Sequence, residues 1–572
     1  MYLKKSTNRK TGRTYLSIVN SYYDKETKQS RTATVRSLGY LDELQKQYDD
    51  PIAFFTEEVR KMNEELNKEN SELNLKISLN ETMPLNYSAR KNFGYAALSK
   101  IYHELEIDKF IKNKQRYSKE EYDANSILKL LVYSRLLFPA SKKKTFENKD
   151  IFFEKFDFSL DDVYRSLSFF NRHCEQLLLW IHEHIKKLYN RNTELVYYDV
   201  TNYYFEIDKQ DELRRKGVSK EHRPDPIVQM GLFMDTNGIP ITYKLFPGNA
   251  PDKTTLIPAL RTIQKEYSLG RIIVVADRGL TTGDNIWYIL SAKNGYILSY
   301  SIRGADKDFQ KYVLDGKGYV EKSNGFKIKS RLYPREIQIT TASGKKMKKV
   351  VDELQIVFYS PEYAAKEKQE REAALIKAMD LIKNPGKYNK ATAYGAAKYV
   401  KNLAFDPNTG EILASAQRKL SLDEEKLKEE EEKFDGYYAI VTSEYKESPE
   451  KIINIYKGLW KIEEAFKITK SEIESRPVYL SLEEHINAHF LTCFISLVIA
   501  KILEYRLQWK YCVTEILESL RKASCSHIKE NYYVFDFFDE VLEEIGKDLN
   551  IDFSKKFMRL KEIKKVLGET KK

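Results

Sequence analysis

Two aspartates beside short apolar segments are the residues in this chain best placed to do chemistry. Asp199 ends the segment Leu195-Val-Tyr-Tyr, and Asp277 follows the apolar run from Arg271 to Ala276. Carboxylates at the ends of buried strands are held rigidly, and they converge if the strands are neighbours. Converging carboxylates repel one another unless a cation lies between them. Taken alone, each aspartate could equally well be an ordinary strand-end or turn residue with no role in chemistry. The prediction therefore depends on the pair.

The donor types in this pair indicate a cation and a reaction. Hard oxygen ligands with no Cys or His cluster favour Mg²⁺, for which Mn²⁺ can substitute. Two such ions stabilise the attacking and the leaving oxygen when a phosphodiester is displaced in line. We therefore predict two metal ions held by carboxylates.

A third carboxylate is expected from a helix that the sequence predicts over residues 451–471. At 3.6 residues per turn, one face of this helix carries Tyr456, Trp460, Glu463, Lys467 and Lys470. The adjacent face carries Ile462, Phe466 and Thr469. The first face could hold a metal and contact DNA phosphates, although a solvated helix with Glu–Lys pairs has the same composition.

The elements that must position these acids have the order β-β-β-α-β-α-β. The predicted strands are 195–199, 227–234, 239–246, 271–276 and 296–302, and the predicted helices are 252–267 and 281–292. Asn237-Gly238 is typical of a hairpin turn between the second and third strands. Three antiparallel strands followed by α/β alternation is the order of an RNase-H-like core, whose last helix is still missing at this point of the chain.

This pattern divides the chain into six regions, which together predict an α/β protein. Its RNase-H-like catalytic core is interrupted by a β-rich insertion and flanked by helical N-terminal and C-terminal regions. The regions are a basic β-meander (1–45), a helical DNA-binding region (46–190), the first part of the core (191–305), the insertion domain (306–435), the last strand and catalytic helix (436–475), and a C-terminal helical region (476–572).

Net charge favours a polyanionic partner. The 572 residues include 96 Lys and Arg against 84 Asp and Glu, a balance of +12. Residues 1–40 hold nine basic residues, among them Arg31 and Arg36, against Asp24 and Glu26. A second basic cluster is Lys142-Lys143-Lys144. A solvated face is the alternative for any single lysine, but the first forty residues together favour DNA.

Other features favour a soluble cytoplasmic protein. The four cysteines show no C-x-x-C spacing, so we expect reduced thiols. No apolar run comes after the first lysines, so no signal peptide is expected. The most apolar stretch, 490–500, is too short for a membrane span and is predicted to be a buried helix.

Three blocks of this sequence resemble the bacterial insertion-sequence transposases with a DDE catalytic triad, in the branch with a β-rich insertion before the last acid. That family carries the signature Tyr-x2-Arg-x3-Glu-x6-Lys. Tyr456, Glu463 and Lys470 match it at the correct spacing, and Leu459 stands where the arginine is expected. The segments 197–202 and 274–280 resemble the two aspartate blocks. Arg476-Pro-Val-Tyr479 and 484–489 resemble the family's segments on the C-terminal side of its glutamate.

The resemblance implies a Mg²⁺-dependent transposase that cleaves at terminal inverted repeats and joins the ends to target DNA. Asp199, Asp277 and Glu463 would hold two metal ions. The expected DNA contacts are Tyr456, Trp460, Lys461, Lys470, Arg278, Lys142, Lys143, Lys144, Arg31 and Arg36. A homodimer would hold the double-stranded DNA in a paired-end complex. The expected location is the nucleoid in a bacterial cytoplasm, and no membrane association is expected.

The C-terminal helices offer a candidate for the dimer contact. They carry more apolar residues than one core-facing stripe requires: Phe490, Phe494, Leu497, Val498 and Leu503.

Two other functions are compatible with parts of the sequence. An aspartyl-phosphate phosphatase with Asp199 as nucleophile typically has a second aspartate two residues later, where this chain has Thr201. A catalytically inactive DNA-binding regulator derived from a transposase is the other alternative, and the complete set of three acids argues against it.

Overall fold

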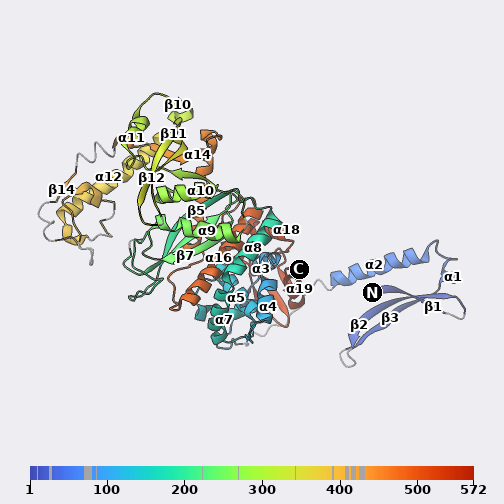
Figure 1. Ribbon diagram of the computed structural model, residues 1–572. Coiled ribbons are helices and arrows are strands. Elements are labelled where there is room, and N and C mark those ends of the chain that lie inside the picture. Colours follow the sequence, from blue (N-terminus) through green and yellow to red (C-terminus); the bar gives the residue numbers. More distant parts are fainter. Residues whose placement is uncertain are drawn as a thin grey trace. The chain divides into compact units, whose positions relative to one another are not determined.

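The structure is a computed structural model, and it divides the chain into two compact units, residues 1–88 and 89–572 (Figure 1). It describes residues 1–8, 11–24, 29–69, 80, 82–85, 87–221, 223–267, 269–341, 343–388, 392–393, 395–405, 411–413, 420–423 and 432–572.

The first unit is an antiparallel three-stranded sheet with a helix packed on it. Its elements are β1 (Tyr2–Thr7), β2 (Thr14–Asp24), β3 (Gln29–Tyr40), α1 (Leu41–Leu44) and α2 (Pro51–Glu69). Leu16, Leu44 and Phe55 form its small core. The N-terminal ammonium of Met1 donates to Oδ1 of Asn63 on α2 at 2.7 Å. The unit is therefore longer than the predicted meander 1–45, because α2 belongs with the sheet and not with the helical region that comes next.

A nine-stranded sheet forms the centre of the second unit (Figure 1). Five of its strands come from the predicted core: β5 (Leu195–Tyr204), β6 (Ile227–Met234), β7 (Pro240–Pro247), β8 (Ile273–Ala276) and β9 (Gly295–Ser299). They lie in the order β7-β6-β5-β8-β9, in which β5, β6 and β7 are antiparallel while β8 and β9 run parallel to β5. This is the RNase-H-like order, with α9 (Leu256–Glu266) and α10 (Gly283–Ser291) as the connections after β7 and β8.

Strands of the predicted insertion continue this sheet. After β9 comes β15 (Tyr437–Thr442), which lies in the region predicted to hold the last strand of the core, and then the insertion's β12 (Lys346–Tyr359), β11 (Lys327–Thr340) and β10 (Val320–Glu321). The segment 306–435 is β-rich as predicted, but its long strands share the hydrogen-bond ladder of the core instead of forming a separate sheet. Its helices are α11 (Lys307–Leu314) and α12 (Pro361–Lys383), and a small ladder joins β13 (Val400–Lys401) to β14 (Ser421–Leu422).

The N-terminal and C-terminal helical regions form one body around a single buried helix. The helices before the sheet are α3 (Tyr95–Glu104), α4 (Ile107–Arg116), α5 (Ala124–Leu137), α6 (Lys142–Glu147), α7 (Leu160–Arg172) and α8 (Cys174–Tyr189). Those after it are α16 (Glu483–Arg506), α17 (Val513–Lys522), α18 (Glu540–Leu549) and α19 (Leu560–Glu569). Short strands also pair across the two regions: β4 (Arg90–Asn92), β16 (Ser524–His527), β17 (Tyr532–Phe535) and β18 (Phe557–Arg559).

Helix α16 packs against α5, α7, α17 and β7 and is buried on all sides over most of its length. It has the length and composition of a membrane span, yet 94% of its most apolar window is buried inside the protein. The predicted buried helix is therefore present, and longer than the apolar stretch 490–500. All five apolar residues proposed for a dimer contact are at most 3% exposed, so that prediction is wrong. Their surface is already buried within the chain, by neighbouring helices and by the sheet, where Phe490 packs on Tyr203 and Phe494 on Tyr243.

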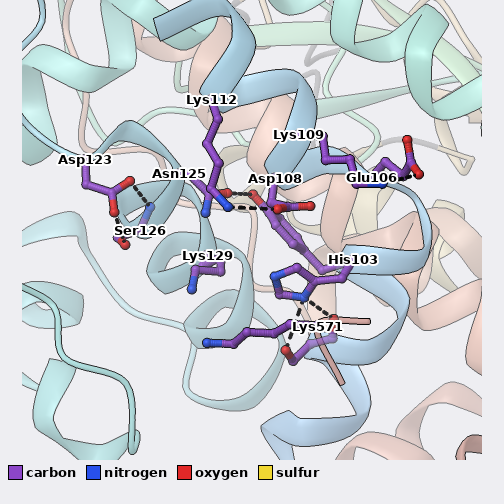
Figure 2. Close-up of polar contacts among 12 residues, drawn as sticks. His103, Glu106, Asp108, Lys109, Lys112, Asp123, Asn125, Ser126, Lys129 and Lys571 are labelled. Carbon is purple, nitrogen blue, oxygen red and sulfur yellow. Dashed lines mark hydrogen bonds and ion pairs between the residues drawn. The ribbon is translucent and has the colours of Figure 1, made fainter. Parts of the chain in front are cut away.

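Polar contacts fix the first helices against one another and against the end of the chain (Figure 2). Asp123 caps α5 by accepting from the amide of Ser126 at 3.0 Å. Buried Lys129 on α5 pairs with Glu154, which also lies 3.4 Å from Lys571. The end of the chain therefore lies against residues more than four hundred positions earlier in the sequence.

A buried ion pair joins the helical body to the sheet. Arg191, just after α8, donates from Nε to Oδ2 of Asp235 at 2.8 Å, and both side chains are at most 1% exposed. The same guanidinium contacts Nδ1 of His182 at 3.0 Å and the carbonyl of Pro240 at 2.8 Å. Burial, followed by the charge of Arg191, lowers the pKa of His182 to about 3, so this imidazole is a neutral acceptor.

We expect Asp235→Ala to destabilise the second unit by about 3–5 kcal/mol, because the substitution leaves Arg191 buried without its carboxylate. Thermal unfolding followed by circular dichroism measures the effect. The exposed Asp208 supplies the control, since Asp208→Ala should leave the midpoint within about 1 °C. Equal midpoints for the two variants would contradict the assignment of this pair as a structural link.

Candidate active site

Parallel pairing of β5 and β8 brings the two aspartates to one place. Tyr197 on β5 lies opposite Val275 on β8, so continuing that register by two residues sets Asp199 opposite Asp277. Asp277 is the first residue after β8, as predicted. Asp199 lies within β5, which runs on to Tyr204, and not at a strand end as the sequence suggested.

The carboxylate of Asp277 is oriented by two hydroxyl groups. Ser299 at the end of β9 donates to Oδ1 of Asp277 at 2.8 Å, and Tyr456 donates to the same oxygen at 3.3 Å. The Tyr456 hydroxyl also lies 2.8 Å from that of Tyr438 on β15. Burial, followed by the charges of Tyr438 and Asp277, raises the pKa of Tyr456 far above its ordinary value. Tyr456 is therefore a hydroxyl donor to the acid at all ordinary pH values.

Asp199 lies in an environment that favours its neutral form. Burial is the main cause that raises its pKa to about 6, and the carboxylates of Asp277 and Glu463 raise it further. Lys220 and the amide of Val200, which donates to Oδ1 at 2.7 Å, act in the opposite direction. The charges of the other two predicted acids, Asp277 and Glu463, thus both act on Asp199.

The predicted helix 451–471 is broken in the middle, and the break is fixed to β5. It consists of α14 (Pro449–Lys457) and α15 (Trp460–Ser471). Tyr197 donates its hydroxyl proton to the carbonyl of Ile455 at 3.0 Å, and a Cβ atom at Gly458 would lie 2.1 Å from that hydroxyl. Only glycine fits at the break, so the strand that carries Asp199 also positions the helix that carries Glu463.

Two neighbouring glutamates on α15 have different environments. Glu463 is exposed on the face that was predicted to contact DNA, whereas Ile462 and Phe466 are buried. Glu464 pairs with the buried ammonium of Lys501 at 3.0 Å, and Lys501 also pairs with Glu504 on α16. The carboxylate of Glu464 is thus part of the packing between α15 and α16, and the carboxylate of Glu463 is open to a ligand.

Several predicted DNA contacts lie on exposed surface. Trp460 at the start of α15 is 53% exposed, which excludes a packed core tryptophan. Arg278 directly follows Asp277 and is exposed. Lys143 and Lys144 are exposed on α6, where Lys144 lies 3.6 Å from Glu147.

In the first unit, the predicted contacts Arg31 and Arg36 are exposed on β3. Arg36 pairs with Glu58 of α2 at 2.8 Å.

Three other predicted contacts have different surroundings. Lys142 is only 5% exposed, and its ammonium lies 3.2 Å from Nδ1 of His489, so it is not a surface contact. Lys461 donates to the carbonyl of Thr236 at 2.6 Å and supports the β6–β7 turn instead of projecting from the helix. Lys470 is half-buried and pairs with Glu221 at 3.2 Å.

Leu459, at the position of the family's arginine, is 7% exposed and packs in the core, so its side chain offers no polar contact.

Sequence reasoning missed the residues that support the acids. Lys220, Ser299 and Tyr438 act on Asp199 or Asp277 through segments that meet only in the folded sheet. No local motif marks them. The available signal was the strand order, which sets Ser299 on β9, beside β8, and Tyr438 on β15, the next strand beyond β9.

The donor set fits hard divalent cations, because it consists of carboxylate oxygens. Asp277 and Glu463 raise the pKa of Asp199, so the three carboxylates repel one another. A bound cation relieves this repulsion. Within the described part of the chain, no three His, Cys, Asp or Glu side chains already stand in a closed ligand arrangement.

Asp199→Asn should stabilise the metal-free protein at neutral pH. The folded-state pKa of about 6 exceeds the ordinary value of 3.8, so ionisation disfavours folding progressively between about pH 4 and pH 6 and fully above that range. The cost removed is about 2–3 kcal/mol. In EDTA, the difference in unfolding midpoint between variant and wild type should widen from pH 4.5 to pH 7. Exposed Asp536→Asn is the control, and a difference that does not change with pH would contradict the raised pKa.

Comparison with known proteins identifies the family. Residues 207–499, which are 293 of the 572, match the family described as Transposase DDE domain, and residues 3–73 match the IS1634 family transposase N-terminal domain. The first match includes Asp277 and Glu463 and begins after Asp199. The search of curated proteins gave no match.

Two solved structures show low similarity to the chain. One is piggyBac transposase in a synaptic complex with hairpin DNA (6% identity, TM-score 0.36, 83% of this chain and 85% of that chain). The other is Mos1 transposase in a paired-end complex with the left transposon end (11% identity, TM-score 0.14, 41% of this chain and 64% of that chain). The family assignment does not depend on either of these two structural similarities. By the family match over more than half of its length, and in keeping with the strand order of its sheet, the chain belongs to the DDE transposases of bacterial insertion sequences.

Proposed function

We propose that this DNA transposase binds the terminal inverted repeats of an insertion sequence, cleaves a strand at each end and joins the freed 3′-hydroxyl to target DNA, in a reaction that depends on Mg²⁺. One observation carries the proposal. Burial raises the pKa of Asp199 to about 6, and the carboxylates of Asp277, directly after another strand, and of Glu463, on a helix, add to this effect. Carboxylates held close together in this way destabilise the folded protein unless a bound cation compensates their charge.

The three carboxylates would hold two Mg²⁺ ions, with Mn²⁺ as a substitute. When bound, the ions supply activation of the attacking oxygen and stabilisation of the leaving oxygen. The chain's own residues set the geometry. Ser299 and Tyr456 fix the Oδ1 atom of Asp277, and the Tyr197 contact with Ile455 fixes the end of α14, directly before the break that leads into α15. Glu464 anchors the same helix through Lys501, which leaves Glu463 to act as the third ligand.

DNA phosphates would lie along the exposed side of this site. Arg278 and Trp460 border the acids on the surface, so the arginine could contact a phosphate and the indole could stack on a base. Lys470 lies close enough to Asp199 for that carboxylate to raise its pKa, although burial, as the largest effect, and Lys220 lower the pKa to about 8. Lys143 and Lys144 on α6 extend the basic surface, and Arg31 and Arg36 provide contacts from the first unit.

Coordinated cutting of two ends implies two protomers in the active complex, with one catalytic centre at each end. The contact between protomers must use surfaces other than the apolar residues of α16, because these are buried within one chain. We place this reaction in the bacterial cytoplasm, on nucleoid DNA.

Alanine substitution of any one of the three acids should abolish strand cleavage, by at least about a hundredfold, because each removes a metal ligand. Binding of terminal-repeat DNA in a gel-shift assay should stay within about threefold of wild type. Glu464→Ala is the matched control on the same helix and should retain most of the activity. Near-normal cleavage by Glu463→Ala would exclude it as a ligand. Cleavage by none of the proteins, wild type included, would favour the inactive regulator.

Deletion of residues 1–88 should weaken binding to DNA and flatten the dependence of log K on log salt. The unit is compact by itself, and its exposed strands carry basic side chains, so its loss releases fewer counterions on binding. A fluorescence titration of labelled terminal-repeat DNA at several salt concentrations measures the slope. An unchanged slope would exclude the first unit from the DNA interface.

A further inference from the structure

A cavity of about 280 Å³ lies where the helical body meets the loop after the catalytic helix. Its wall includes Arg135 from the end of α5, Lys142 from α6, Tyr164 from α7 and His489 from α16. The loop 474–480 closes it, and that loop contains the Arg476-Pro-Val-Tyr479 motif for which the catalytic site gives no use. Its size suits one nucleotide unit and is too small for a duplex.

Two cations in this wall are buried without a carboxylate partner. Lys142 and Arg135 are 5% and 6% exposed. Within the described ranges of the chain, no ion pair joins either one to an acidic side chain. Arg135 donates to backbone carbonyls, to that of Ala140 at 2.9 Å and to that of Glu474 at 3.3 Å, so its charge is hydrogen-bonded but not neutralised. Buried cationic groups are normally paired with an anion or made neutral by a shift of pKa, and an anion bound in the cavity would provide the partner that both side chains lack.

The electrostatics of the cavity agree with an absent anion. Burial, and then the charge of Arg135, lower the pKa of Lys142 to about 7, while Cys493 acts weakly in the opposite direction. His489 has its pKa lowered well below the ordinary value by burial, Lys142 and Arg135, so it is neutral. Its Nε2 lies 3.0 Å from the carbonyl of Ser475, which leaves Nδ1 as the acceptor for Lys142. The side chain of Glu474 is exposed and is not among the causes of the Lys142 shift.

A short run of charges connects the cavity to the catalytic acids. Arg476 in its wall pairs with Glu221, and Glu221 also pairs with Lys470 at 3.2 Å. Lys470 in turn lies within electrostatic reach of Asp199. At the mouth, Tyr479 is 69% exposed and Tyr164 is half-buried, so aromatic surface stands outside the buried cations.

We propose that this cavity binds one phosphodiester of a single DNA strand, with the phosphate against Lys142 and Arg135 and the attached nucleoside against Tyr479 and Tyr164. Cations inside and aromatic rings at the rim are the two components of single-strand binding sites. This proposal depends on the proposed function in one respect only, which is that the bound polyanion is DNA. It assigns Lys142 to a buried phosphate site, where the sequence had suggested a surface contact.

The test is calorimetric titration of the whole protein in EDTA with pentathymidylate, whose internal phosphates are diesters. Two buffers of different ionisation enthalpy give the protons taken up on binding. At pH 8 Lys142 is mostly neutral, and a phosphate beside it should restore its proton. Lys142→Met should therefore lose about 0.9 proton of uptake relative to wild type and bind about tenfold more weakly. Any remaining uptake belongs to Lys470, whose pKa is about 8.

Lys143→Met is the matched control, since it removes the exposed lysine next in sequence. It should keep the full proton uptake and lose about threefold or less in affinity. Tyr479→Ala, at an exposed position that folding tolerates, should weaken pentathymidylate binding but not the binding of inorganic phosphate. This second variant keeps the test valid if Lys142→Met does not fold.

Equal proton uptake by wild type and Lys142→Met would overturn the proposal. The proposal would also be overturned if inorganic phosphate caused proton uptake and pentathymidylate did not. Wild-type affinity of the Tyr479→Ala variant for pentathymidylate would overturn it as well. These outcomes are independent of cleavage. A protein that cleaves terminal-repeat DNA but fails this test has the proposed function without the phosphate site, and a protein that passes without cleaving has the site without the function.

Discussion

The parallel pairing of β5 with β8 is the constraint on which the rest of this structure depends. It sets Asp199 opposite Asp277 and determines which strand ends face the same side of the sheet. The antiparallel hairpin β6–β7 covers one edge of β5, and β9 with β15 extends the sheet beyond β8. Ser299 and Tyr438 are brought beside Asp277 by these neighbouring strands. Hydrogen bonding between backbones thus creates an acidic centre from residues almost eighty positions apart.

The third acid depends on contacts that are not part of the sheet. Helix α15 is held at one end by the Tyr197 hydroxyl beside Gly458 and on its side by the pair between Glu464 and Lys501. One anchor comes from the strand of Asp199 and the other from the buried helix α16. Because both anchors are rigid, the position of Glu463 relative to Asp199 is set by the packing of the whole second unit. This explains how an exposed side chain can have a defined place.

Much of the core could be predicted from the sequence, because its signals are local. Apolar runs bounded by turns marked β5 to β9, and helical spacing separated Glu463 from the buried face of α15. The long-range arrangement could not be predicted in the same way. The sequence indicated a separate insertion domain, whereas β11 and β12 join the core sheet through pairing with β15, which no local pattern encodes. The apolar excess of α16 suggested a dimer contact, because composition cannot distinguish a helix surrounded by its own chain from one that awaits a partner.

The central place of α16 has a consequence for synthesis of the protein. Helices α3 to α8 are complete once residue 189 has been made, but the helix around which α5 and α7 pack ends at Arg506. At about 5–20 residues per second, the ribosome needs roughly 15–60 s to make the intervening segment. During that time the faces of α5 and α7 that pack against α16 have no partner, and they are candidates for chaperone binding. The first unit has no such dependence, so the basic strands can fold while the catalytic unit is still being translated.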